Sequence, residues 1–238
     1  MKIKMIGTGS ISSNRNSATA LIDDEILMDI PNGSVKAMKN QGIEINKIDY
    51  IFITHFHGDH YFDIPFIFLN YKFNKREKKI NIVGPKGIKD KVKMICDMAF
   101  LSLFDEMSSI LEFIEVEDKK VIDFESFKVE VIKTVHSDNL ESYGYIITKE
   151  NKIIGYTGDT TLCGATKYIT SNTDICIVDM AMIIGNESHM GIDNIKELAI
   201  NSKRIIPTHM IDNTYNEIKK SNIDNVLVLN DGESIEEI

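Results

Sequence analysis

The sequence predicts an α+β protein in which two mixed β-sheets pack face to face, with helices on their outer faces. Short apolar runs rich in β-branched residues recur along the chain, as expected of buried strands. These runs form two groups of mostly antiparallel strands, and helical segments follow each group, which favours two packed sheets covered by helices. Hydrophobic residues make up 43% of the 238 residues, enough for a substantial core. We expect residues 1–238 to form a single domain.

The N-terminal half alternates strands with helices. Its clearest strand is the run from Ile48 to Thr54, which is rich in β-branched and aromatic residues. One helix is expected to end at Gly42. Another should begin near Asp59, although Pro65 is tolerated only near a first helical turn. The expected strands are 1–7, 18–23, 25–30, 48–54 and 80–83, and the expected helices are 33–41, 59–69 and 86–107.

The C-terminal half contains further strands, with helices between the later ones. The helix over 192–202 carries apolar residues at Ile192, Ile195 and Leu198 on one face. The expected strands are 112–116, 127–134, 143–148, 152–156, 174–179, 203–207 and 225–229, and the second expected helix is 214–221.

Composition narrows the function classes. The formal net charge of -9 argues against non-specific nucleic-acid binding, which depends on broad positive charge. The three cysteines, Cys96, Cys163 and Cys176, include no Cys-x-x-Cys pair and are typical of reduced thiols in a cytoplasmic protein. We expect no signal peptide and no membrane contact, since no run approaches the roughly 18 apolar residues of a membrane span.

Three of the six histidines lie in one stretch, Thr-His-Phe-His-Gly-Asp-His. His55 and His57 are two residues apart and point the same way on extended backbone, and Gly58 then permits a sharp turn. Imidazoles and carboxylates are ligands that divalent metals prefer. The stretch therefore predicts a site that can hold two ions, with His55 and His57 on one and Asp59 and His60 on the other.

Three further candidate ligands lie at strand ends. His136, Asp159 and His209 each follow an apolar run that leads into a small or turn residue, and ligands on a rigid scaffold suit a preorganised metal site. His136 can supply a third nitrogen ligand to the first ion. His209 can complete the coordination of the second ion, and Asp159 can bridge the two ions. Taken singly, either histidine would more often be a structural residue, but together with the His-rich stretch they favour metal binding.

These residues together resemble the ligand set of the metallo-β-lactamase-fold hydrolases. The motif Thr-His-x-His-x-Asp-His, followed by His136, Asp159 and His209 in that order, covers the whole set. The resemblance implies a four-layer αβ/βα sandwich with a dinuclear site at one edge. It also implies that His55, His57 and His136 hold the first metal ion, that Asp59, His60 and His209 hold the second, and that Asp159 bridges them.

Within that superfamily the chain is similar to the ribonuclease Z and cyclic-phosphate phosphodiesterase branch. The likeness is carried by Gly7 to Ser10, Asn14 to Ser17, Met28-Asp29, His136-Ser137 and Tyr143-Gly144-Tyr145. His189 matches an additional, non-ligand histidine of the branch, although Met190-Gly191 after it departs from the pattern there. The alternative for His189 is a residue at a helix N-terminus without a catalytic role.

The resemblance implies a metal-dependent hydrolase that activates water to cleave a phosphodiester bond. Asp59 and His189 are the candidate catalytic residues. Asp59 would orient or deprotonate the attacking water, and His189 would stabilise the phosphate oxygens or protonate the leaving oxygen. Asp29 and Asp179, each ending an apolar strand, are candidates for orienting the ligand imidazoles, or else ordinary strand-end turns. The expected cofactors are two divalent ions, with zinc favoured by the donor set and manganese or iron as alternatives.

The expected substrate is a small or cyclic phosphodiester or a nucleotide, with RNA as an alternative. Ribonuclease Z has a Gly/Pro-rich arm that grips tRNA, and residues 61–135 contain no insertion of that kind. The basic stretch 72–93 is expected to be a solvated surface, or else a patch that contacts a phosphate-bearing substrate. The resemblance also allows a homodimer.

Two alternatives to a phosphodiesterase remain at this level. One is a lactone or thioester hydrolase on the same scaffold. The other is a non-catalytic metal-binding protein, against which the complete set of ligand residues argues.

Overall fold

The computed structural model describes residues 1–236 and contains two mixed β-sheets that pack face to face. In the described residues the first sheet has seven strands in the order β13-β1-β2-β3-β4-β5-β6, and the second has six in the order β12-β11-β10-β9-β8-β7. The first sheet consists of β1 (Ile3–Gly7), β2 (Thr19–Ile22), β3 (Ile26–Met28), β4 (Tyr50–Phe52), β5 (Ile80–Gly84), β6 (Leu111–Glu115) and β13 (Ser234–Ile235). The second consists of β7 (Val121–Asp123), β8 (Lys128–Ser137), β9 (Leu140–Lys149), β10 (Lys152–Tyr156), β11 (Ile175–Asp179) and β12 (Ile205–Thr208).

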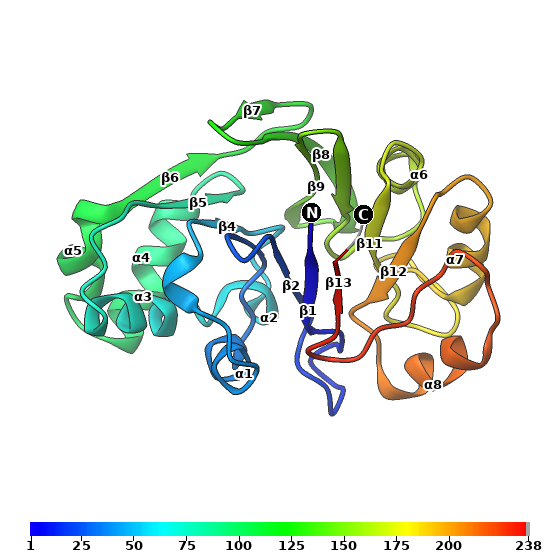
Figure 1. Ribbon diagram of the computed structural model, residues 1–238, viewed down its shortest axis with the longest axis horizontal. Helices are drawn as coiled ribbons and strands as arrows, with labels where there is room; N and C mark the ends of the chain where they lie inside the picture. Colours follow the sequence, from blue (N-terminus) through cyan, green and yellow to red (C-terminus); the bar gives the residue numbers. More distant parts are fainter. Residues whose placement is uncertain (237–238) are drawn as a thin grey trace.

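Helices cover the outer face of each sheet, so the fold has four layers. Helices α1, α3, α4 and α5 lie on one side of the molecule and α6, α7 and α8 on the other, with β1 and β13 running side by side between the two groups (Figure 1). The α-helices are α1 (Ser34–Asn40), α2 (Gly58–Tyr61), α3 (Ile64–Phe73), α4 (Ile88–Ala99), α5 (Leu103–Met107), α6 (Gly164–Ser171), α7 (Ile192–Ala199) and α8 (Asp212–Lys220). Two short 3-10 helices span Ile45–Lys47 and Ser108–Ile110.

Alternating side chains explain the layers, because successive residues of a strand face opposite sides of its sheet. In β1, Ile3 and Met5 join a hydrophobic cluster that lies between the two sheets, whereas Ile6 joins the cluster under the helices of the first sheet. In β11, Ile177 faces the other sheet while Val178 packs with α6 and α7. Full burial of one such aliphatic side chain contributes about 1.5–3 kcal/mol, so the three clusters hold the layers together.

Each sheet combines antiparallel and parallel pairing, which confirms the two predicted mixed sheets, although parallel pairs are more frequent than the strand groups suggested. Strands β3 to β6 pair in parallel, as do β10 to β12. The remaining neighbours are antiparallel. The parallel strands are joined by helical crossovers, which return each strand in the same direction. As a result, the carboxyl ends of several strands meet at one edge of the sandwich.

Several predicted elements differ from the structure. The predicted helix 59–69 is broken between Tyr61 and Ile64, with Pro65 in the first turn of the second piece, where its missing N–H costs nothing. The predicted helix 86–107 is two helices, because Phe100 is extended and Ser102 has a left-handed backbone. The predicted strand 225–229 is reduced to one isolated bridge between Val226 and Ile205.

The sequence analysis missed two strands, β7 and the two-residue β13, and one α-helix, α6. Strand β7 has only three residues, and its side chains are mostly exposed, so it lacks an apolar run. Helix α6 contains three β-branched residues, Thr166, Ile169 and Thr170, which lower helix propensity. In the described part of the chain, no helix is both long and apolar enough to cross a membrane.

Candidate metal site

The predicted ligand residues come together at the edge where the parallel strands of both sheets end. Strand β4 leads to His55, while β10, β11 and β12 lead to Asp159, Asp179 and His209. His136 lies near the end of the long strand β8, where the pairing with β9 shifts register. The two sheets therefore supply the site jointly, and neither half of the chain contains all the candidate ligands.

Three histidines form the first group. Nδ1 of His57 lies 3.0 Å from Nε2 of His55 and 3.1 Å from Nε2 of His136. One ligand atom from each of the three residues lies within 4.8 Å of the others. Three imidazole nitrogens that converge in this way offer one face of a divalent-metal site.

Asp59, His60 and His209 form the second group, with the same 4.8 Å limit between their ligand atoms. Nε2 of His209 lies 3.5 Å from Oδ2 of Asp59. Asp159 stands between the two groups, because its Oδ2 is 3.2 Å from Nε2 of His60, 3.3 Å from Nε2 of His209 and 3.9 Å from Nε2 of His136. All seven predicted ligand residues thus lie in one cluster, in which the converging groups overlap, and one of these groups adds Asp179 and His189 to Asp159 and His209.

Unsatisfied nitrogens in this cluster fit a bound cation. Among residues 1–236, Nε2 of His60 and both ring nitrogens of His209 are buried and make no hydrogen bond. A buried polar atom without a partner costs about 1–3 kcal/mol, and such atoms in a native protein commonly belong to a site for a water or an ion. Imidazole and carboxylate donors are those that divalent metals accept, so the residues fit a divalent metal site.

Burial lowers the pKa of two histidines of the first group, His55 and His57. It lowers the pKa of His55 well below the ordinary value, and the nearby His60 adds to this effect. Burial and His136 together lower the pKa of His57. Because a metal binds the deprotonated imidazole, these two histidines are already in the ligand form at neutral pH.

Charge pairing governs the second group. Burial opposes protonation of His60 and His209, but Asp159 and other carboxylates outweigh it, raising the pKa of His60 well above the ordinary value and that of His209 to about 10. Burial also disfavours ionisation of Asp159, yet His209 and His60 hold its pKa well below the ordinary value. Without an ion, the group is thus held together by imidazolium–carboxylate contacts.

Asp29 supports His60 from behind. Its Oδ2 lies 2.9 Å from Nδ1 of His60 and accepts a hydrogen bond from the Tyr156 hydroxyl at 3.2 Å. The backbone N–H of Thr54 donates to Oδ1 at 2.8 Å, and its hydroxyl donates to Oδ2 at 2.9 Å. Asp29 is one of the residues predicted to orient the ligand imidazoles, whereas the contacts of Thr54 and Tyr156 with it were not predicted. Thr54 is part of the recognised motif, whereas nothing in the sequence singles out Tyr156.

Asp179 connects His189 to His209. Its Oδ2 is 3.1 Å from Nδ1 of His189, and its Oδ1 is 3.6 Å from Nδ1 of His209. The rings of His189 and His209 stack with centroids 5.2 Å apart, and the centroid of the His136 ring lies 4.9 Å from that of His189. His189 therefore lies beside both groups, just before helix α7, while its catalytic role stays a prediction.

A cavity of about 660 Å³ adjoins His136. The turn between β8 and β9 forms one wall, and Glu187 and Ser188 form part of another. The two walls are tied together by a hydrogen bond of 3.0 Å between Nδ1 of His136 and the carbonyl of Ser188. The lining of the cavity includes the carboxylates of Asp138, Glu141 and Glu187. Lys133 also lines it and pairs with Glu141 at 3.4 Å.

Many cations of the basic stretch 72–93 are paired with carboxylates. Arg76 and Lys78 both contact Asp49, and Lys93 contacts Asp97. Lys72 pairs with Glu106, and Lys79 pairs with Glu112. These pairs favour the expectation of an ordinary solvated surface.

Comparisons with known proteins agree with this fold. A family model described as Anti-Pycsar protein Apyc1 matches residues 1–229. The Ribonuclease Z of Picrophilus torridus is 34% identical over 150 residues, which cover 60% of this chain and 46% of that protein. The Ribonuclease Z of Ligilactobacillus salivarius is 37% identical over 162 residues, covering 63% and 49%. The chain thus spans about half the length of these curated relatives.

A longer alignment joins the chain to a Ribonuclease Z of Staphylococcus aureus. The two are 24% identical over 297 residues, which cover 97% of this chain and 95% of that protein. Because the alignment is longer than the 238 residues of this chain, the relative contains segments with no counterpart here.

Solved structures establish the fold. Human tRNase Z, short form, superposes with a TM-score of 0.77 at 18% identity over 99% of both chains. The protein YhfI of Bacillus subtilis, described as a metallo-beta-lactamase fold protein, gives 0.76 at 19% identity over 99% of both chains. A diphosphatase of the PhnP family gives 0.76 at 18% identity over 100% of this chain and 98% of the other. The predicted metallo-β-lactamase fold, with its four-layer αβ/βα sandwich, is therefore confirmed.

Proposed function

The chain belongs to the Anti-Pycsar protein Apyc1 family, and we propose that it is a metal-dependent phosphodiesterase that acts on small or cyclic phosphodiesters, including cyclic nucleotides. The observation that carries this proposal is the pair of ligand groups on either side of the Asp159 carboxylate. The names of its relatives, Ribonuclease Z and a PhnP-family diphosphatase, support chemistry on phosphate esters.

The proposed site holds two divalent ions, and zinc is the preferred identity. His55, His57 and His136 would hold the first ion, Asp59, His60 and His209 would hold the second, and Asp159 would bridge them. Five imidazoles with two carboxylates suit zinc, and manganese and iron accept the same donors. When bound, the two ions would supply an activated water at neutral pH and polarise the phosphoryl oxygen.

Asp59 and His189 are the proposed catalytic residues. The Asp59 side chain is 18% exposed at the edge of the cluster, where it can orient an attacking water and accept its proton. Nδ1 of His189 is engaged by Asp179, so its Nε2 is the ring atom available to a phosphate oxygen or a leaving oxygen. Asp179 thereby fixes the orientation of this imidazole.

The cavity beside His136 supports a small substrate. Three carboxylates and one paired lysine line it, a charge distribution that repels the closely spaced phosphates of RNA but tolerates a single phosphodiester. Several of the basic residues in the 72–93 stretch are already paired. The Staphylococcus aureus Ribonuclease Z contains segments that this chain lacks, which also favours a small substrate over RNA.

Three further proposals concern the domain organisation, the cellular location and the oligomeric state. Because both sheets supply ligands to one cluster, we treat residues 1–238 as one domain. The free cysteines Cys96, Cys163 and Cys176 support a cytoplasmic location. A homodimer follows only from the family resemblance, and a size measurement in solution would test it.

The test is a substrate screen of the zinc-loaded protein against its His57→Ala variant. We expect turnover of bis-p-nitrophenyl phosphate and of a 3′,5′-cyclic nucleotide, with much slower cleavage of a precursor tRNA. Because the His57 side chain is exposed, its removal should spare the fold yet lower activity by roughly 100-fold or more. Turnover of a lactone or a thioester with bis-p-nitrophenyl phosphate left intact would contradict the proposal, as would full activity in the variant.

A further inference from the structure

The backbone conformation of His209, together with the carboxylates that face its ring, sets the position of the imidazole. Among the residues that the structure describes, neither ring nitrogen of His209 makes a hydrogen bond, although both are buried. The residue has a φ of 59°, a left-handed conformation that is costly for a side chain and persists only where the surroundings hold it. The contacts of the next residue, Met210, therefore help to hold the backbone that places the imidazole beside these carboxylates.

The loop between β1 and β2 holds Met210 on both sides of its backbone. The N–H of Met210 donates to the carbonyl of Thr8 at 3.1 Å, and the carbonyl of Met210 accepts from the N–H of Ser10 at 3.1 Å. Gly9 forms an isolated bridge with Met210. These bonds join the end of β1, in the first sheet, to the segment after β12, in the second.

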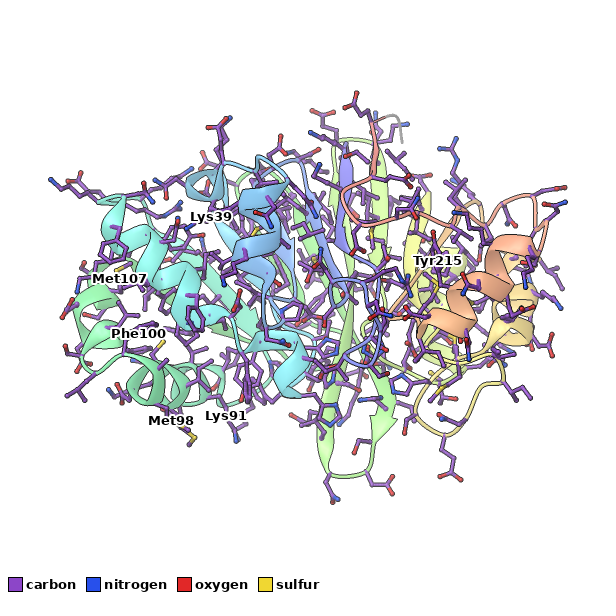
Figure 2. All side chains as sticks on the ribbon, turned by 90° about the horizontal axis from the view of Figure 1, so that it is seen from below. Lys39, Lys91, Met98, Phe100, Met107 and Tyr215 are labelled. Atoms are coloured by element: carbon purple, nitrogen blue, oxygen red, sulfur yellow. The ribbon has the colours of Figure 1, made fainter. Side chains whose placement is uncertain are left out.

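Arg15 makes a further contact with the backbone of Met210. We call the contacts of Thr8, Ser10 and Arg15 with this backbone the Met210 clamp. Nη2 of Arg15 donates to the carbonyl of Met210 at 2.7 Å, and its Nη1 donates to Oγ1 of Thr8 at 3.0 Å. Its Nε lies 3.7 Å from Oδ1 of Asp212, and the guanidinium lies 4.2 Å from the ring centroid of Tyr215. Figure 2 shows Tyr215 on α8, at the opposite end of the molecule from Met98. Arg15 is thus fixed between the N-terminal loop and the segment that follows His209.

We propose that Arg15 is a positioning residue for the metal site. It holds the backbone next to His209 so that the imidazole meets Asp59 and His60 in the second ligand group. A planar guanidinium can donate to two acceptors at fixed angles, which a lysine ammonium cannot reproduce. The inference rests on the proposed metal-dependent function and adds a residue that contacts neither ion nor substrate.

Arg76 provides a matched control. Its side chain is only 3% exposed and pairs with Asp49 at 2.6 Å. It also donates to the carbonyls of Lys78 and Lys79, and its guanidinium lies 4.8 Å from the ring centroid of Tyr71. Loss of Arg76 removes the same kinds of contact as loss of Arg15, but none of them involves a proposed ligand or a neighbour of one.

The experiment compares metal binding by the wild-type, Arg15→Met, Arg15→Lys and Arg76→Met proteins. Each is stripped with a chelator and titrated with Co²⁺, whose visible absorption reports the coordination of each ion. Urea unfolding of the metal-free proteins measures the general stability. We expect Arg15→Met to bind the first ion as the wild type does and the second roughly 10–100-fold more weakly. Arg15→Lys should fall between, and Arg76→Met should keep both affinities.

Each other outcome contradicts the inference. Two wild-type affinities in Arg15→Met would overturn it, and so would equal weakening of both ions in Arg15→Met and Arg76→Met, which indicates general destabilisation. If Arg15→Met does not fold, Arg15→Lys carries the test, and wild-type affinities there would overturn the inference. A wild-type protein that binds no cobalt would contradict the proposed function as well, whereas a normal wild type with an unaffected Arg15 variant would contradict the inference alone.

Discussion

Asp29 illustrates how single buried carboxylates organise the candidate site. It is fully buried, yet its oxygens are met by Thr54, Tyr156 and His60. An ionised carboxylate accepts hydrogen bonds only, so all its neighbours act as donors. Nδ1 of His60 therefore donates to Asp29, while Nε2 faces Asp159 at 3.2 Å in the candidate metal site.

Asp29→Asn should weaken metal binding. The amide replaces an acceptor oxygen with a donor, so one of its present donors loses its partner and His60 is no longer held in the ligand orientation. We expect affinity for the second ion to fall roughly 10–100-fold and the metal-free protein to lose about 1–3 kcal/mol of stability. Metal titration and urea unfolding measure the two effects.

Asp174→Asn serves as the control for that substitution. Asp174 accepts from the N–H of Ile153 at 2.8 Å and from Nζ of Lys203 at 2.7 Å, without any contact to a proposed ligand. Its substitution should leave the metal affinities unchanged. Unchanged affinities in Asp29→Asn as well would show that His60 does not depend on the carboxylate.

At the residue scale, the sequence predicted the candidate ligands but not the residues that support them. Imidazole and carboxylate chemistry identified the seven proposed ligands, because the residue types alone limit what can bind a metal. It did not identify Tyr156 or the role of Arg15. Their contacts join segments 127 and 195 residues apart in the chain, and no local pattern encodes such a separation.

At the scale of the elements, left-handed residues turn the strand ends into the site. Asp29 has a φ of 56° after β3, Gly158 has a φ of 59° after β10, and His209 has a φ of 59° after β12. Each lies within two residues of the end of a strand that has a parallel neighbour, at the edge where the candidate ligands lie. Such strain is tolerated where the surrounding structure holds it and is common at functional sites.

Gly158→Ala tests this turn geometry. A Cβ at Gly158 would lie 2.8 Å from Cβ of Thr54, and a left-handed backbone is itself unfavourable for alanine. We expect a loss of about 1–3 kcal/mol in the free energy of unfolding, measured in urea. Gly164→Ala is the control, because an added Cβ there meets nothing within 4 Å, and its effect should stay within about 0.5 kcal/mol. Equal stabilities of the two variants would contradict the argument.

Elements were predicted well where an apolar run coincided with a strand, as in β4, β10 and β11. They were predicted poorly where tertiary contacts override local preference. Asn225 begins the predicted strand 225–229, but its side-chain amide donates to the carbonyls of Ala199 and Ser202. That interaction ties the segment to the end of α7 and leaves only one bridge to β12.

At the scale of the whole molecule, the two sheets are connected by polar contacts as well as by their common core. Lys149 at the end of β9 reaches Asp23 at 2.9 Å and Glu25 at 2.7 Å in the turn between β2 and β3. Burial opposes ionisation of Asp23, but hydrogen bonds from Lys149 and from the N–H of Lys2 outweigh it and lower its pKa.

Lys149→Met should therefore reduce stability in a pH-dependent way. Because the folded-state pKa of Asp23 lies below the ordinary value of 3.8, ionisation of Asp23 stabilises the fold above that pH. This contribution disappears as the pH falls through the lowered pKa. We expect a loss of about 1 kcal/mol at pH 7 that shrinks toward pH 3 in urea unfolding. Lys128→Met removes an exposed pair with Asp123 and should change little. A Lys149→Met loss that is constant with pH would argue against the Asp23 linkage.

Chelation should destabilise the whole molecule, because the proposed ligands come from both sheets. An ion that binds only the folded state adds about 2.7 kcal/mol of stability at a free concentration 100 times its dissociation constant. Thermal unfolding should therefore shift upward with added zinc and downward with a chelator. His57→Ala should show a smaller shift. An unfolding temperature that changes with neither zinc nor a chelator would contradict the proposed metal site.

The sequence by itself determined which side chains are candidate metal ligands and how its strands alternate. Residue types and spacing are local properties, so they predicted the His-rich motif, the later ligands at strand ends and two sheets with outer helices. Only the tertiary structure decided how these parts meet. The parallel pairing of β10, β11 and β12 brings Asp159, Asp179 and His209 to one edge. The Met210 clamp connects the first sheet to the residue that follows His209, a proposed ligand. Those placements depend on contacts between residues far apart in the chain, which form only when both sheets pack on their common core.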